Sequence, residues 1–128
     1  MSATAHGSFE VTLTPVAGEL DGMINRTELA KAFVGDLVGT GRGLMLSAGD
    51  PGTGNAGYVA IEIVDGRLFE HEGSFALQQF GTMSEGAQTL HYEIVPGSGR
   101  GALQGISGAL ALTIEADGTH NYALEYEL

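Results

Sequence analysis

The sequence predicts an all-β protein, an antiparallel up-and-down barrel of about eight strands. Short segments of alternating polar and apolar residues recur along the chain, as expected for strands with one buried face. Turn signals such as DG, EG, PGSG and ADG separate these segments, which is typical of hairpins. The 128 residues fit one domain, residues 1–128. Many hairpin-linked strands in so short a chain favour a sandwich or a closed barrel.

The alternating segments are expected to be the strands, in order along the chain. The first places Phe9, Val11 and Leu13 on one face and polar residues on the other. The later segments show the same period of two, which is the side-chain period of a strand. They cover residues 7–14, 25–33, 35–46, 57–64, 73–80, 89–95, 108–116 and 120–128.

The segment 25–33, NRTELAKAF, is the one that could instead be a helix, because Glu, Leu, Ala and Lys are good helix formers. Leu29, Lys31 and Phe33 nevertheless alternate with small or acidic residues, and the surrounding segments are β-like. We therefore interpret this segment as a strand.

The segment 35–46 is rich in glycine at even spacing, with Gly35, Gly39, Gly41 and Gly43. One face of this strand therefore carries almost no side chains. A bare face permits sharp bending at a barrel corner, or leaves room for a ligand inside. We interpret the glycines as a source of curvature, which favours closure into a barrel.

The segment 57–64 carries one carboxylate, Glu62, among apolar residues. If Asp65 and Gly66 form a two-residue turn, Glu62 lies opposite Phe69 and shares a face with the more apolar set of the next strand. A three-residue loop would shift the register by one and turn Glu62 to solvent. In the first register, the residues on the Glu62 face are Tyr58, Phe69, His71, Phe75, Leu77 and Gln79.

The following hairpin is expected to turn at Glu85 and Gly86. Gln79 then lies opposite Tyr92, and Leu77 lies opposite Ile94. The residues that join the Glu62 side are Leu90, Tyr92 and Ile94, while His91 and Glu93 point outward.

The composition excludes several classes of function. Five Lys and Arg against 16 Asp and Glu give a net charge of −11, which opposes binding to nucleic acid and to anionic membranes. The chain has no cysteine, so thiolate chemistry is absent. It shows no signal peptide and no long apolar run, so we expect a cytoplasmic protein.

Motifs for cofactors, metals or covalent catalysis are not found. The loops GTGRG and PGSGRG match neither GxGxxG nor a phosphate-binding loop, and neither opens a helix. The four histidines lack metal-ligand spacing, and no GxSxG motif is present. We expect no cofactor and no metal.

Two stretches, GSFALQQFGTM and IVPGSGRGALQGISG, carry a family resemblance. The chain resembles a bacterial family of small single-domain proteins of unknown function with the allene oxide cyclase-like β-barrel, a calycin-like fold. The resemblance extends from GSFEV near the start to the closing YALEYEL. It implies a fold, an eight-stranded barrel with a small interior, and self-association; it implies no reaction, because the family has no settled activity.

Two positions differ from the residues that are common in that family, and the second of them bears on the strand register. Family members commonly carry His where this chain has Gln79, so an imidazole is missing here. They also carry a basic residue where this chain has Ile63. Because a barrel interior hardly accepts a basic side chain, position 63 is expected outside and Glu62 inside.

A carboxylate inside an apolar barrel suggests a ligand site or a catalytic site. The first hypothesis is a barrel that binds a small apolar or mixed ligand in its lumen. The second is a cofactor-independent isomerase or cyclase, in which Glu62 acts as acid or base and Tyr92 or His71 supports the developing charge. The candidate ligand-binding residues are Tyr58, Phe75, Leu77, Gln79 and Ile94.

The third hypothesis is a non-catalytic structural barrel, with Glu62 in a buried hydrogen-bond network. Val59, Ile61 and Ile63 would lie on the outer face, which favours a homo-oligomer under any of the three functions. The sequence names no substrate.

Overall fold

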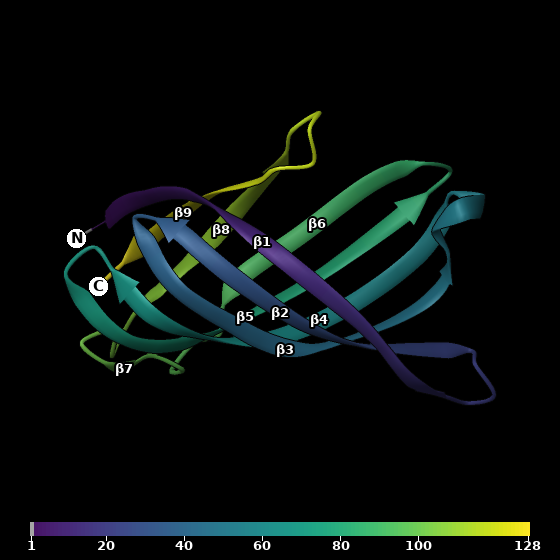
Figure 1. Cartoon of the computed structure of the whole chain (residues 1–128), viewed down its shortest axis with the longest axis horizontal. Coiled ribbons are helices and arrows are strands. Elements are labelled where there is room, and N and C mark those ends of the chain that lie inside the picture. Colours follow the sequence, from purple (N-terminus) through teal and green to yellow (C-terminus); the bar gives the residue numbers. More distant parts are fainter. Residues whose placement is uncertain (1) are drawn as a thin grey trace.

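The structure, a computed structural model, describes residues 2–128, which form one closed antiparallel barrel of eight strands with one short extra strand, β7 (Figure 1). Each segment predicted as a strand corresponds to one strand of the barrel, including 25–33, so the predicted all-β barrel is confirmed. The strands are β1 (Ser2–Glu19), β2 (Ile24–Gly35), β3 (Leu37–Asp50), β4 (Asn55–Leu68), β5 (His71–Ser84), β6 (Ala87–Ile94), β7 (Arg100–Gly101), β8 (Ser107–Ile114) and β9 (His120–Glu127). The predicted bounds differ at some ends: Gly35 belongs to β2, Asp36 lies between β2 and β3, and the segments 89–95, 108–116 and 120–128 extend one or two residues beyond their strands.

The order of the strands around the barrel is β4-β3-β2-β1-β9-β8-β6-β5, and pairing of β4 with β5 closes the ring. Most neighbouring strands pair over long ladders. In the described part of the chain, β6 and β8 instead pair at one position, Glu93 with Ala109. We call this place the β6–β8 seam.

The two ends of the barrel differ (Figure 1). At one end lie both termini and the connections β2–β3 and β4–β5, and the segment 95–106 closes it with Leu103 and Ile106, both fully buried. We call this the closed end. The other end, the hairpin end, carries the connections β1–β2, β3–β4 and β5–β6, and the short 3₁₀ turn Pro51–Thr53.

Burial of the inward side chains decreases toward the hairpin end. Phe75, Val64 and Leu124 are buried near the closed end. Val11 and Leu112, further along, are partly buried, and Leu13 is exposed although it follows the same alternation. The interior is therefore packed at the closed end and becomes accessible toward the hairpin end.

The glycines of β3 bring its backbone close to β4. A Cβ atom at Gly43 would lie 2.1 Å from the carbonyl oxygen of Ile61, and one at Gly39 would lie 2.3 Å from that of Asp65. Only a residue without Cβ permits this approach. Gly35 differs from the other glycines of the predicted strand, because it ends β2 with a φ of 108°.

The predicted turn at Asp65 and Gly66 is wrong. Both residues lie within β4, and the turn falls at Phe69 and Glu70, with Leu68 paired to His71. Gly66 is used for close packing, since a Cβ atom there would lie 2.2 Å from the Val38 carbonyl oxygen. The predicted turn at Glu85 and Gly86 is confirmed, with Gln79 opposite Tyr92 and Leu77 opposite Ile94.

The corrected register leaves Glu62 on the interior face. Glu62 pairs with Leu77 instead of Phe69, a shift of an even number of residues, which preserves the face of every side chain. Glu62 is 1% exposed, so the expectation that it points inward is confirmed.

Candidate functional site

Three polar side chains meet inside the barrel: Lys31 from β2, Glu62 from β4 and Tyr92 from β6. We call them the buried triad. Each follows the strand alternation that points its neighbours inward, such as Leu29 and Phe33 beside Lys31. All three are buried.

One carboxylate oxygen organises the triad. Lys31 Nζ donates to Glu62 Oε1 at 2.8 Å, and the Tyr92 hydroxyl donates to the same oxygen. Lys31 Nζ also donates to the Tyr92 hydroxyl oxygen at 2.5 Å. Charge-assisted hydrogen bonds of this kind are shorter and stronger than neutral ones.

Aromatic rings complete the surroundings of the ammonium group. Lys31 Nζ lies 4.6 Å from the centre of the Phe9 ring and 4.9 Å from that of Tyr92. A cation over an aromatic face is attracted by the ring quadrupole, the more so when desolvated. The rings thus replace part of the hydration that Lys31 loses inside the barrel.

Burial changes the proton affinities of two members of the triad. Burial lowers the pKa of Lys31 from 10.5, although the neighbouring Glu62 acts in the opposite direction. Burial raises the pKa of the Tyr92 phenol, and the negative charge of Glu62 raises it further. Tyr92 therefore stays protonated and remains a hydrogen-bond donor.

Gly41 makes room for the carboxylate. A Cβ atom at position 41 would lie 2.5 Å from Glu62 Oε2 and 3.1 Å from a ring carbon of Phe33. The bare face of β3 therefore serves the site as well as the curvature, because it receives the Glu62 side chain.

The second carboxylate oxygen, Glu62 Oε2, is buried, and within residues 2–128 no hydrogen-bond donor reaches it. A buried acceptor of this kind loses hydration without compensation, at a cost of about 1–3 kcal/mol. Such an atom is satisfied when a donor group of a bound molecule reaches it.

Tyr58 and Gln79 lie on the interior face toward the hairpin end. The Tyr58 hydroxyl donates to Gln79 Oε1 at 2.9 Å, and both side chains are partly buried. Gln79 pairs with Tyr92 across the β5–β6 ladder, so this pair is adjacent to the triad.

The other three candidate ligand-binding residues, Phe75, Leu77 and Ile94, are 1%, 1% and 3% exposed and belong to the hydrophobic core. Leu77 pairs directly with Glu62 and with Ile94. They support the triad from the closed end.

His71 lies apart from Glu62. It pairs with Leu68 at the start of β5, six residues from Leu77, the partner of Glu62. Six residues of a strand span roughly 20 Å. The expected neighbourhood of His71 and Glu62 is therefore not formed, because the turn lies further along the chain than predicted.

Lys31 is the residue that sequence reasoning missed as a member of the site. Its signal was present, since it stands between Leu29 and Phe33 on the apolar face of its strand. A lysine at such a position needs a buried partner, and Glu62 is the carboxylate that shares the interior.

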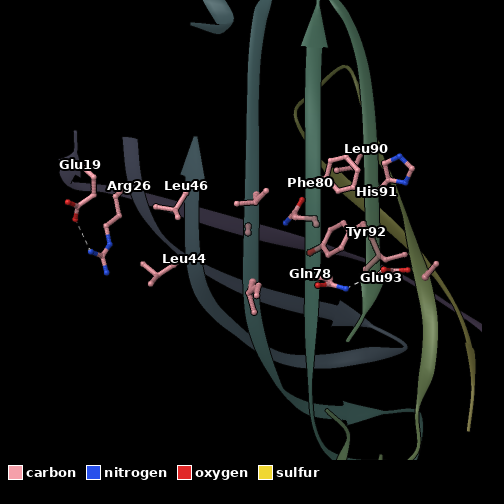
Figure 2. A pocket seen from close by; sticks show the side chains of 16 residues that line it. Glu19, Arg26, Leu44, Leu46, Gln78, Phe80, Leu90, His91, Tyr92 and Glu93 are labelled. Carbon is pink, nitrogen blue, oxygen red and sulfur yellow. Dashed lines mark hydrogen bonds and ion pairs between the residues drawn. The ribbon is translucent and has the colours of Figure 1, made fainter. Parts of the chain in front are cut away.

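A second feature is a groove of about 1070 Å³ whose lining residues come from β1 to β6 and from β8. Most of them point outward, whereas those that lie on the inward face include Ala60, Gln79, Tyr92 and Leu110. Figure 2 shows its side chains in a row that begins with the ion pair of Arg26 and Glu19 and ends at Glu93, which accepts a hydrogen bond from Gln78. Tyr92 is among the lining residues. Lys31 and Glu62 are not among the lining residues, so the groove reaches the triad at Tyr92.

None of the helical segments within residues 2–128 has the length and apolar character needed to cross a membrane. No group of three or more His, Asp or Glu side chains in that range is arranged to hold a metal ion.

The fold and the site together define the protein as a small closed β-barrel with a buried Lys-Glu-Tyr triad. Residues 5–126 match the model of the family described as a protein of unknown function, DUF3224, and the chain belongs to that family. It is similar to the crystal structure of a protein of unknown function from that family from Shewanella oneidensis MR-1, with 42% identity and a TM-score of 0.93. The match covers 100% of this chain and 98% of the other. No protein with a curated description matches the chain.

Proposed function

We propose that the barrel binds a small apolar or mixed molecule that enters from the hairpin end, and that the buried triad recognises a polar group of it. The observation that carries this proposal is Glu62 Oε2, a buried carboxylate oxygen without a donor within residues 2–128. A hydroxyl or N–H group of a ligand would satisfy it.

The energetics of the triad support a role beyond folding. Removing Lys31 and Glu62 from water costs several kcal/mol per ion, and apolar residues of similar size often give equal or greater stability. A buried ion pair is therefore weak evidence for a role in stability. A buried charged group in a small barrel is a candidate functional group for that reason.

The decrease in burial toward the hairpin end supports ligand entry from that end and a ligand that is mostly apolar. Tyr58 and Gln79 are partly buried on the inward face, and Val11 and Leu112 are partly buried apolar residues that pack against the core. A ligand with an apolar body and one donor group suits these surroundings, because pockets of this kind orient ligands with few polar groups.

The test compares hydroxylated compounds with hydrocarbons of the same shape, for example phenol with benzene and short alkanols with alkanes. Amide chemical shifts of the labelled protein are expected to change around Tyr58, Glu62 and Tyr92 with the hydroxylated member of each pair. Glu62→Gln should abolish this preference, whereas Glu93→Gln, an outward acid, should retain it. Changes restricted to the outer face, or equal for both members, would contradict the proposal.

A second candidate function is proton-transfer catalysis, an isomerisation or cyclisation. It is favoured by the hydrogen-bond network in which Tyr92 donates to Glu62 and accepts from Lys31, and by the resemblance to allene oxide cyclase-like barrels. Glu62 would exchange a proton with the substrate while Lys31 and Tyr92 stabilise the charge. With a substrate identified, Glu62→Gln should abolish turnover but leave a hydrocarbon analogue bound; turnover that persists would exclude this function.

A further inference from the structure

The outer surface of β3, β4 and β5 exposes a continuous apolar face. We call it the outer apolar face. Its residues are between 41% and 56% exposed, and monomeric proteins rarely leave large contiguous patches of this kind in water. They are Leu44, Leu46, Val59, Ile61, Ile63 and Phe80.

The strand register shows that these side chains are direct neighbours. One row across the sheet joins Leu46, Val59 and Phe80, and the next joins Leu44 and Ile61. Directly opposed residues on one face lie about 5 Å apart. The face is therefore one surface and not a set of scattered residues.

The same rows continue into charged residues at both edges of the face. On the β2–β3 edge lie Arg26, Glu28 and Arg42, and on the β6 edge lies Glu93. Arg26 is paired with Glu19 at 3.8 Å, and among the described side chains Arg42 has no ion-pair partner. Two of the chain's five basic residues thus border this face.

We propose that the outer apolar face is the interface of a symmetric homodimer. A two-fold axis along β4 places the β2–β3 edge of one copy over the β5–β6 edge of the other, so that Arg42 lies on the side of Glu93 of the second copy. The charges at the edges then complement each other, which is the requirement for a self-complementary interface.

The size and charge of the face suit a second copy. From β2 to β6 there are four strand spacings, or about 19 Å, so a second copy centred on β4 covers the apolar residues together with the charged residues at both edges. With a net charge of −11, two copies repel each other over most of their surfaces, and this face joins apolar residues to charges of both signs. Anionic lipids and nucleic acids are repelled for the same reason.

The test is sedimentation equilibrium over a range of concentrations with the full chain. The wild type is expected to be a dimer, and Ile61→Lys is expected to be a folded monomer with the far-UV circular dichroism spectrum of the wild type and a lower unfolding midpoint, because the dimer no longer stabilises the folded state. The matched control is Ile114→Lys, since Ile114 is 60% exposed and Ile61 56%; this control should remain dimeric. A monomeric wild type, or a dimer that survives Ile61→Lys, would overturn the proposal.

Charge reversal tests the arrangement of the two copies. Arg42→Glu and Glu93→Arg should each weaken the dimer about tenfold, and the double variant should regain most of the affinity. A dimer whose double variant is weaker than both single variants would refute this packing. Binding of the monomer to vesicles of neutral lipid through the same residues would also refute it.

Discussion

Lys31 Nζ and Glu62 Oε1 lie 2.8 Å apart inside the barrel, although 31 residues separate them in the chain. The two side chains are 5% and 1% exposed, and strand β3 lies between their strands. They meet because Gly41 and Gly43, which occupy the interior face of β3, have no side chains to separate them.

Loss of the ammonium group should destabilise the barrel. Lys31→Met leaves the Glu62 carboxylate buried without its counter-ion, and we expect a loss of about 3–5 kcal/mol in the free energy of unfolding. The double variant Lys31→Met/Glu62→Leu should recover most of it, because the uncompensated charge is gone. Urea denaturation measures both. Arg100→Met, an exposed control on β7 and away from the outer apolar face, should change stability by about 0.5 kcal/mol or less.

Gly41→Ala should disturb the carboxylate directly. Its methyl group would lie 2.5 Å from Glu62 Oε2, and overpacking of this kind costs about 1–3 kcal/mol. Gly57→Ala is the matched control on the neighbouring strand, since the nearest atom to a Cβ there is 3.7 Å away. Thermal unfolding of both variants distinguishes the steric effect from a general effect of glycine replacement; equal midpoints would contradict our account.

Tyr92→Phe should remove one of the two donors to Glu62 Oε1 and the acceptor of Lys31. We expect a loss of about 1–3 kcal/mol, because two buried groups lose a partner. Tyr58→Phe breaks the bond to Gln79 in a half-buried setting and should cost about 1 kcal/mol or less. Denaturation curves that rank the two variants in the opposite order would show that the triad is less tightly bonded than its distances indicate.

The Tyr92 phenol should also make stability fall at alkaline pH. Its pKa is raised from 10.0 by burial, so above pH 10 the unfolded chain loses a proton that the folded protein keeps. Stability then decreases with rising pH by about 1.4 kcal/mol per pH unit for this group. Below pH 10 the group has no such effect. The advantage of the wild type over Tyr92→Phe should therefore be constant below pH 10 and shrink above it.

Titration of Lys31 should change the stability in the opposite direction, so that stability increases with pH. Its pKa is lowered from 10.5, so between that lowered pKa and pH 10.5 the unfolded chain binds more protons than the folded protein. In this window its contribution to stability rises with pH. Measurements on Tyr92→Phe and the double variant Lys31→Met/Glu62→Leu separate the two groups, because each variant removes one of the slopes.

The strands and the barrel could be predicted because alternation and turn signals act locally. The position of the turn after β4 could not be predicted from the sequence. Asp65-Gly66 has the residues of a tight turn, but here Gly66 lies inside the strand and packs against Gly39 of the neighbouring strand. This choice depends on contacts between strands far apart in sequence. The inward direction of Glu62 was still predicted correctly, since the true register differs by an even number of residues.

Two of the three residues of the buried triad could be predicted from the sequence, because they lie on neighbouring hairpins. Glu62 and Tyr92 share a face within two successive hairpins, so pairing arithmetic reaches both. Lys31 reaches them across the interior of the barrel, and hairpin arithmetic does not connect it to either. His71 was placed too close because the predicted turn came too early in the chain.

The β6–β8 seam is the place where the barrel should open locally most easily. The other strand boundaries of the ring hold at least eight residue pairs each within residues 2–128, whereas Glu93 and Ala109 form the pair at this one. Transient opening concentrates where the fewest bonds must break. The barrel wall next to Tyr92 should therefore open transiently more often than the other walls, and its amide protons should exchange with deuterium sooner than those of the β3–β4 ladder.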